Sequence, residues 1–211
     1  MKYLIIIISL FLSYSNINAQ EFKRLSTESA EDFVKRNIPE SDTGYIEFLG
    51  HVLETKLWDN KTETIFCFYV GGDINNNTIN HYYLIGTLYV KTEANTYKRV
   101  FIDDKDLAYE NESIKVESIF FANADKTDAT KELAILYSHK TDEESEANGT
   151  NYFTHFYDNI NFSNPPKKLT EITTFKEIFH EFEGTIDDGD LQKAKFKTAS
   201  DIKNALKCIG Y

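Results

Sequence analysis

The sequence has few of the residues and motifs that usually signal catalysis or covalent cross-linking. Its 211 residues include two cysteines, one tryptophan and five histidines. Cysteines and histidines nowhere share the spacing of a zinc site or a redox pair. The nucleophile elbow, the paired-histidine metalloprotease motif, the phosphate-binding loop and the dinucleotide-binding fingerprint are also missing. These absences weigh against the enzyme families that such motifs define.

Long apolar runs are equally scarce, and the clear one lies at the start of the chain. Lys2 precedes an apolar stretch over residues 3–12, and the small residue Ala19 precedes Gln20. This pattern predicts a secretory signal over residues 1–19. The stretch is shorter than the roughly 20 apolar residues that a membrane-spanning helix requires, and no later segment reaches that length. We therefore predict an exported chain, periplasmic or extracellular, without a transmembrane segment.

Positive charge is in deficit. Lysine and arginine number 23 against 34 aspartates and glutamates, so the formal net charge is −11. A surface with this balance repels phosphate backbones, and nucleic acid is therefore not an expected partner. Such charge also serves solubility.

The two cysteines leave two alternatives open. Cys67 lies within a strand-like segment and Cys208 within the last predicted helix. An exported protein meets an oxidising compartment, in which a disulfide between them would tie the end of the chain to its sheet. The alternative is that both remain isolated, buried thiols.

Residues 45–160 carry the composition of β-strands. Segments rich in Ile, Val, Phe, Tyr and Thr alternate with polar turns and predict about seven strands, joined largely by hairpins. The predicted strands are 45–58, 63–72, 81–92, 97–103, 114–123, 131–140 and 151–159. Several of these segments are apolar on both faces, so both faces of their sheet must be covered by helices or by a second sheet.

Helical patterns occur on both sides of this β body. Capping-box spacing and one-sided apolar stripes predict one N-terminal helix and two C-terminal helices. The predicted helices cover 26–39, 173–184 and 198–211. Between the last two, Asp187-Asp188-Gly189 predicts a hairpin turn.

These elements predict a single α+β domain over residues 20–211. Its β body at 45–160 is expected to form one mostly antiparallel sheet of about seven strands. The C-terminal helical segment at 167–211 and the N-terminal helix are expected to pack on that sheet.

The loop after Phe121 is the strongest candidate for a metal site. Asn123, Asp125 and Asp128 place side-chain oxygens at nearly alternating positions, and Glu132 follows before the next strand. Calcium loops use such alternation because neighbouring side chains then point at one hard cation. These four residues are therefore the predicted calcium ligands.

The same stretch resembles the FG-GAP or VCBS type of repeat. The match consists of Phe121, Asn123, Asp125, Glu132 and Leu133. The resemblance implies a calcium-stabilised β-turn in an extracellular binding or scaffold module. The sequence departs from the repeat because asparagine holds the first acidic position, glycine is absent, and one extra residue precedes the glutamate. The alternative is a turn of the same shape that needs no ion.

Aromatic side chains suggest a second kind of site. Trp58, Tyr82 and Tyr152 are candidates for stacking on a sugar ring. The alternative is that they pack within a sheet, where aromatic residues are favoured in any case. His139 and His155 could also face each other across a hairpin and bind a transition metal.

Together these features favour a secreted, non-enzymatic module that binds a protein or a glycan. A second hypothesis is a hydrolase of an extracellular polymer, with carboxylates that the fold brings together. A third is a periplasmic inhibitor or immunity protein that uses the acidic loop 141–149.

Overall fold

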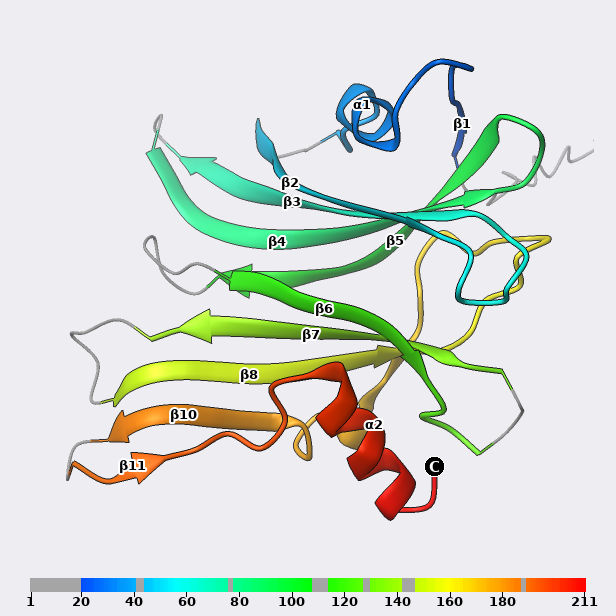
Figure 1. Cartoon of the computed structure of the whole chain (residues 1–211). Helices are drawn as coiled ribbons and strands as arrows, with labels where there is room; N and C mark the ends of the chain where they lie inside the picture. The colour runs from blue at the N-terminus through cyan, green and yellow to red at the C-terminus, as the bar shows by residue number, and fades with distance from the viewer. Residues whose placement is uncertain are drawn as a thin grey trace, which may run out of the picture.

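The polypeptide folds into two antiparallel sheets that face each other, with one helix on the outer side of each sheet (Figure 1). The computed structural model describes residues 20–40, 44–75, 78–107, 114–126, 130–141, 147–186 and 189–211, with the side chains of 44–45, 73–75, 78–82 and 104–107 left out. The predicted signal at 1–19 lies outside the described residues.

The first sheet is a meander with one added edge strand. Its strands are β1 (Glu21–Lys23), β2 (Gly44–Thr55), β3 (Thr64–Asn75), β4 (Thr78–Lys91) and β5 (Thr96–Leu107). Their order is β1-β5-β4-β3-β2, and every neighbouring pair is antiparallel.

The second sheet repeats the meander with the next strands of the chain. Its strands are β6 (Ile114–Ala122), β7 (Glu132–Lys140), β8 (Ala147–Tyr157), β9 (Glu171–Ile172), β10 (His180–Ile186) and β11 (Leu191–Gln192). Their order is β11-β10-β8-β7-β6, and β9 pairs with the end of β8 that β10 leaves open.

Two helices cover the outer faces, and both begin where their caps predict. In α1 (Ala30–Arg36), the side chain of Ser29 accepts a hydrogen bond from the Asp32 backbone N–H. In α2 (Ala199–Cys208), Thr198 and Asp201 form a complete capping box, and Ile202 is among the residues buried beneath the helix. Neither helix is long and apolar enough to cross a membrane.

Three apolar clusters join the four layers. The central cluster lies between the sheets and includes Phe66 and Leu88 from the first sheet and Ile135 from the second. A second cluster packs α1 on the outer face of the first sheet, and a third packs α2 on the outer face of the second. Strands that are apolar on both faces are therefore covered on one side by a sheet and on the other by a helix.

The prediction of one sheet of seven strands is wrong, although the β-rich, antiparallel character is confirmed. The seven predicted segments correspond to β2 through β8, but they divide between two sheets. Four shorter strands bring the total within the described residues to eleven. Most pairs join strands that are consecutive along the chain, except that β1 pairs with β5 and β10 pairs with β8. The break comes after β5, where the chain starts the second meander instead of extending the first.

The predicted helix at 173–184 is also wrong. The segment forms a short 3-10 turn, η1 (Thr173–Phe175), and then becomes strand β10. Phe175 and Phe179 are buried as the helical stripe requires, because one turn suffices to place both on the outer core. Beyond that turn, residues 180–186 pair with β8, which would otherwise present unpaired backbone groups.

The disulfide alternative is not realised, because Cys67 and Cys208 are both free. Cys67 is buried in β3, and burial raises the pKa of its thiol to about 12. Cys208 is exposed at the end of α2, on the outer side of the other sheet. The alternative of two buried thiols therefore holds for Cys67 alone.

Candidate functional site

The predicted calcium loop joins β6 to β7, and its glutamate has a definite structural role. Glu132 is fully buried, and its carboxylate accepts a hydrogen bond from the backbone N–H of Ala124. This bond closes the loop across the pair formed by Ala122 and Glu132. Asn123 is exposed, Asp125 is half-buried and Glu132 is buried, so the first and last predicted ligands have different surroundings. Asp128, the remaining predicted ligand, lies outside the described residues.

Burial raises the pKa of Glu132, and the nearby negative charge of Asp125 raises it further. The hydrogen bond from Ala124 acts in the opposite direction. The second carboxylate oxygen of Glu132 has no hydrogen-bond partner among the described residues. A buried carboxylate in this setting favours its protonated form or a cation.

Trp58 and Tyr152, the two aromatic candidates with described side chains, do not form a common platform. Trp58 is 5% exposed, its ring stacks on that of Phe121 at 5.5 Å, and its indole N–H donates to the Lys131 carbonyl at 2.7 Å. Tyr152 packs against the outer core beneath α2. The two rings therefore lie on opposite faces of the second sheet, and the side chain of Tyr82 falls outside the described part. Trp58 joins the β2–β3 loop to the β6–β7 loop.

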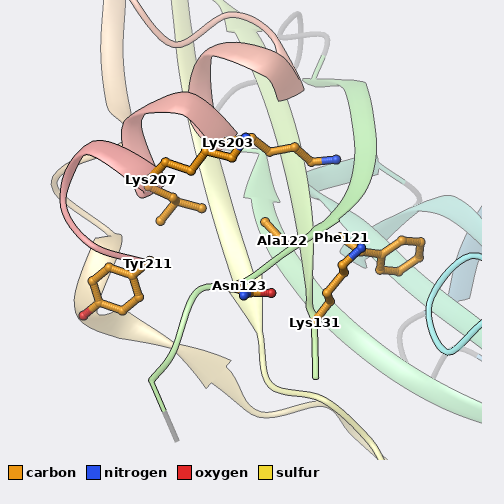
Figure 2. A pocket seen from close by; sticks show the side chains of 8 residues that line it. Phe121, Ala122, Asn123, Lys131, Lys203, Lys207 and Tyr211 are labelled. Atoms are coloured by element: carbon orange, nitrogen blue, oxygen red, sulfur yellow. The ribbon is translucent and has the colours of Figure 1, made fainter. Parts of the chain in front are cut away.

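A pocket lies where the β6–β7 loop meets α2 (Figure 2). Its volume is about 230 Å³. It is lined by Phe121, Ala122, Asn123, Lys131, Lys203, Leu206, Lys207 and Tyr211. Figure 2 shows Lys203 and Lys207 extending from α2, while Asn123 and Lys131 belong to the opposite wall. The loop that the sequence singled out thus forms one wall of a pocket.

The lining of this pocket is basic although the protein is acidic. Lys131, Lys203 and Lys207 form no ion pair with a carboxylate within the described ranges. A fourth lysine, Lys126, lies beside them with its ammonium 4.4 Å from the centre of the Tyr211 ring. Uncompensated ammonium groups around an enclosed space attract an anion.

The fold also assembles a cluster that includes one predicted histidine. Ligand atoms of Asp103, His155 and Glu171 all lie within 4.8 Å of one another. The predicted pairing of His155 with His139 does not occur, because the register places His155 opposite Ile135 and His139 opposite Asn151. The hydrolase hypothesis required carboxylates that meet through the fold, and Asp103 with Glu171 is such a pair. Asp103 and Glu171 are 68 positions apart in the sequence, and no motif connects them.

Comparison with protein-family models, with curated proteins and with solved structures found no match.

Proposed function

We propose that this chain is an exported, non-enzymatic module that binds a protein or glycan partner through an anionic group held in the pocket beside α2. The observation that carries the proposal is the convergence of Lys131, Lys203 and Lys207 on one pocket without carboxylate partners. The predicted signal at 1–19 supports export. The resemblance of residues 121–133 to FG-GAP or VCBS units supports an extracellular binding role.

The dimensions of the pocket limit what enters it. A volume of about 230 Å³ is below the range of about 300–1,000 Å³ that holds a whole small-molecule ligand. The pocket therefore suits a single acidic group with its immediate neighbours, such as one sugar acid of a glycan or one acidic side chain of a protein. Phe121 and Leu206 supply apolar wall area for the carbon atoms of that group.

The overall negative charge does not prevent this binding. Fields between exposed charges decay over about 8 Å at physiological ionic strength. An anion inside the pocket therefore responds mainly to the lysines that line it. At lower ionic strength the remaining carboxylates act over a longer range, and they slow the approach of an anionic partner.

The proposal is tested with two acidic probes and one charge-reversal variant. Isothermal titration calorimetry measures the binding of an oligo-uronate and of a glutamate hexapeptide to the purified chain. We expect one probe to bind, and we expect the double variant Lys203→Glu, Lys207→Glu to weaken it at least tenfold, because two attractive charges become repulsive.

The matched control is the double variant Lys176→Glu, Lys193→Glu, which reverses the same number of exposed charges away from the pocket. It should retain the affinity of the parent chain. An equal loss in both variants would show a general charge effect and contradict the pocket. Absence of binding by both probes would contradict the anionic ligand.

A further inference from the structure

A second site lies between the sheets and is built from three strands. Asp103 belongs to β5, His155 to β8 and Glu171 to β9. Their side chains are 13%, 12% and 30% exposed, respectively. The three ligand atoms lie within 4.8 Å of one another, and the imidazole Nδ1 is in contact with a Glu171 oxygen. Residues from both sheets therefore converge on one point.

A β-bulge turns Asp103 towards this point. The register passes from Thr87 opposite Phe101 directly to Gly86 opposite Asp103, so that Ile102 is the extra residue. Phe101 packs on the outer side of the sheet and Ile102 in the central core. Without the bulge, strict alternation would place Asp103 on the outer face with Phe101. Bulges of this kind commonly re-aim a side chain at a functional site.

Gly86 lies opposite Asp103, where the neighbouring strand packs closely against the bulge. A β-carbon at this position would lie 3.2 Å from the Ile102 β-carbon and 3.3 Å from the Phe68 ring. The absence of a side chain lets the bulged residue sit close against the neighbouring strand. A larger residue at this position would require Ile102 or Phe68 to shift by a few tenths of an ångström.

The segment before β9 delivers Glu171 to the same place. The Phe101 N–H donates to the Lys167 carbonyl at 2.8 Å, and the Leu169 N–H donates to the Phe101 carbonyl at 2.9 Å. These bonds attach the segment to β5 of the first sheet. Two residues later the chain joins the second sheet, where Glu171 pairs with Tyr157. Backbone hydrogen bonds to both sheets thus position the carboxylate.

Side chains around the cluster orient its members. The Tyr157 hydroxyl donates to Asp103 Oδ2 at 3.1 Å. The Tyr137 and Phe153 rings pack against the His155 ring at 5.8 and 5.7 Å between centroids. Outer contacts of this kind hold the ligands of a metal site in place.

We propose that Asp103, His155 and Glu171 bind a divalent first-row transition metal ion, with zinc as the reference ion. One imidazole nitrogen and two carboxylate oxygens form a ligand set for such ions. Ligand atoms in a tetrahedral zinc site lie roughly 3.4 Å apart, so small side-chain movements complete the arrangement. The ion adds positive charge beside two carboxylates in a largely buried space, where the Lys168 ammonium already lies 3.9 Å from Asp103 Oδ1.

The test measures metal binding directly, without any activity assay. The purified chain, without a polyhistidine tag and stripped with a chelator, is titrated with zinc alone by calorimetry and by competition with a chromophoric indicator. We expect one zinc per chain with micromolar or tighter affinity. We expect Asp103→Asn and Glu171→Gln each to weaken binding at least tenfold, because each removes an anionic ligand while preserving its shape.

Two controls keep this test decisive. His51→Gln removes an exposed histidine elsewhere and should bind zinc as the parent chain does. Circular dichroism of the metal-free variants should match that of the parent, and X-ray absorption should show one nitrogen and two oxygens from the protein around the zinc. Equal zinc affinity in Asp103→Asn, or loss of binding only in His51→Gln, would overturn the proposal. So would a His155 ring that stays doubly protonated by NMR in excess zinc, because the cluster would then be an ion pair.

Discussion

The Glu132 carboxylate lies fully buried at the start of β7. Sequence reasoning selected it as a metal ligand because acids that follow an alternating loop commonly close a calcium shell. In the structure the carboxylate accepts a hydrogen bond from the Ala124 N–H and closes the loop as a backbone cap would. Burial makes the charged form costly, and this cost can be measured.

We expect Glu132→Gln to be at least as stable as the parent chain at neutral pH, because the neutral amide avoids the cost of burying a charge. The raised pKa means that the folded state holds the proton more tightly than the unfolded state, whose value is near 4.5. Stability of the parent should therefore fall as the pH rises from 4.5 through the raised pKa, and the variant should lack this decline. Urea unfolding between pH 4.5 and 8 measures both curves.

The same variant also addresses calcium. Because Asn123 is exposed while Glu132 is buried and already engaged, we expect millimolar calcium to leave the melting temperature of the parent chain unchanged. A calcium-dependent increase that disappears in both Glu132→Gln and Asp125→Ala would contradict this expectation and establish the loop as a calcium site.

At the scale of elements, the segment 173–184 shows how tertiary pairing overrides a local pattern. Its apolar stripe has the spacing of an amphipathic helix. The first turn does bury Phe175 and Phe179 in the cluster between α2 and the second sheet. Farther along, Gly184 pairs with Gly149, and the Phe182 ring lies against both glycines. A strand is favoured there because β10 pairs with β8. The local apolar pattern of the segment does not reveal this long-range pairing.

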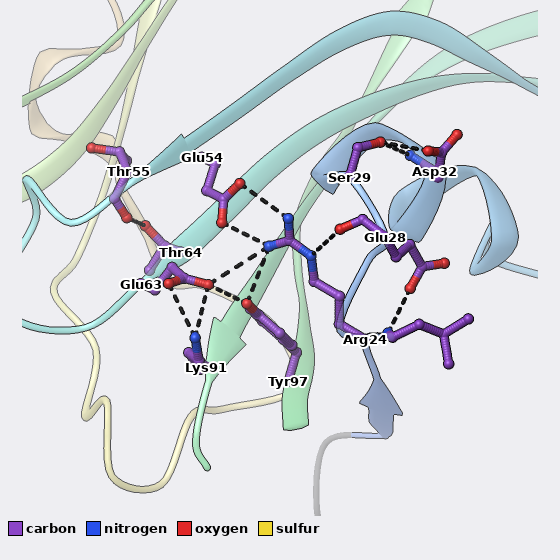
Figure 3. A network of polar contacts seen from close by, with 11 residues as sticks. Arg24, Glu28, Ser29, Asp32, Glu54, Thr55, Glu63, Thr64, Lys91 and Tyr97 are labelled. Atoms are coloured by element: carbon purple, nitrogen blue, oxygen red, sulfur yellow. Dashed lines mark hydrogen bonds and ion pairs between the residues drawn. The ribbon is translucent and has the colours of Figure 1, made fainter. Parts of the chain in front are cut away.

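The N-terminal elements are attached to the first sheet by a polar network (Figure 3). The Arg24 guanidinium contacts Glu54 at 2.7 Å and donates to the Glu28 carbonyl, and the Lys91 ammonium contacts Glu63 at 3.1 Å. The Tyr97 hydroxyl donates a hydrogen bond to the Glu63 carboxylate. The network thus joins the segment between β1 and α1 to β2, β4 and β5.

We expect Glu63→Gln to destabilise the fold by about 2 kcal/mol at neutral pH, since hydrogen bonds to a charged group are lost. Burial opposes the charged form of Glu63, but the bonds from Tyr97 and Lys91 outweigh it and lower its pKa below 4.5. This stabilisation is present above pH 4.5 and is lost as the pH falls through the lowered value. Chemical denaturation at pH 7 and pH 3 measures it. Glu93→Gln, at an exposed acid nearby, is the control and should change stability by less than about 0.5 kcal/mol.

At the scale of the whole molecule, one side chain links the ends of the two sheets. The indole of Trp58 packs in the central core and donates to the Lys131 carbonyl in the loop of the other sheet. From the sequence, Trp58 is a candidate for stacking on a sugar ring, because composition cannot distinguish a buried indole from an exposed one. Its burial makes it a reporter on the packing of one sheet against the other.

We expect Trp58→Phe to lower the free energy of unfolding by about 1–3 kcal/mol while unfolding remains a single transition. The smaller ring leaves part of the core empty, and the Lys131 carbonyl loses its donor. Denaturation followed by circular dichroism measures the change. Leu57→Ala, at an exposed neighbour, should be close to neutral. Two separate transitions in the Trp58 variant would show that the sheets fold independently.

Much of the fold was accessible to sequence reasoning, but little of the second site was. Strand composition located β2 through β8, and cap residues located the starts of α1 and α2, because both signals are local. The loop at 121–133 was identified as special, and it does line the basic pocket. Lys203 and Lys207 were overlooked because lysines on the polar face of a helix look like ordinary surface residues.

The β-rich character, the order of the hairpins, the helix caps and the need to cover both faces of the strands follow from the amino-acid sequence alone. Each of these depends on residues that are close along the chain or on a simple alternation. Only the tertiary structure decided that the cover is a second sheet, that residues 180–186 form a strand, and that Asp103 meets His155 and Glu171. These outcomes depend on a bulge at Ile102 and a segment that bonds to both sheets, and such long-range geometry leaves no periodic trace in the sequence.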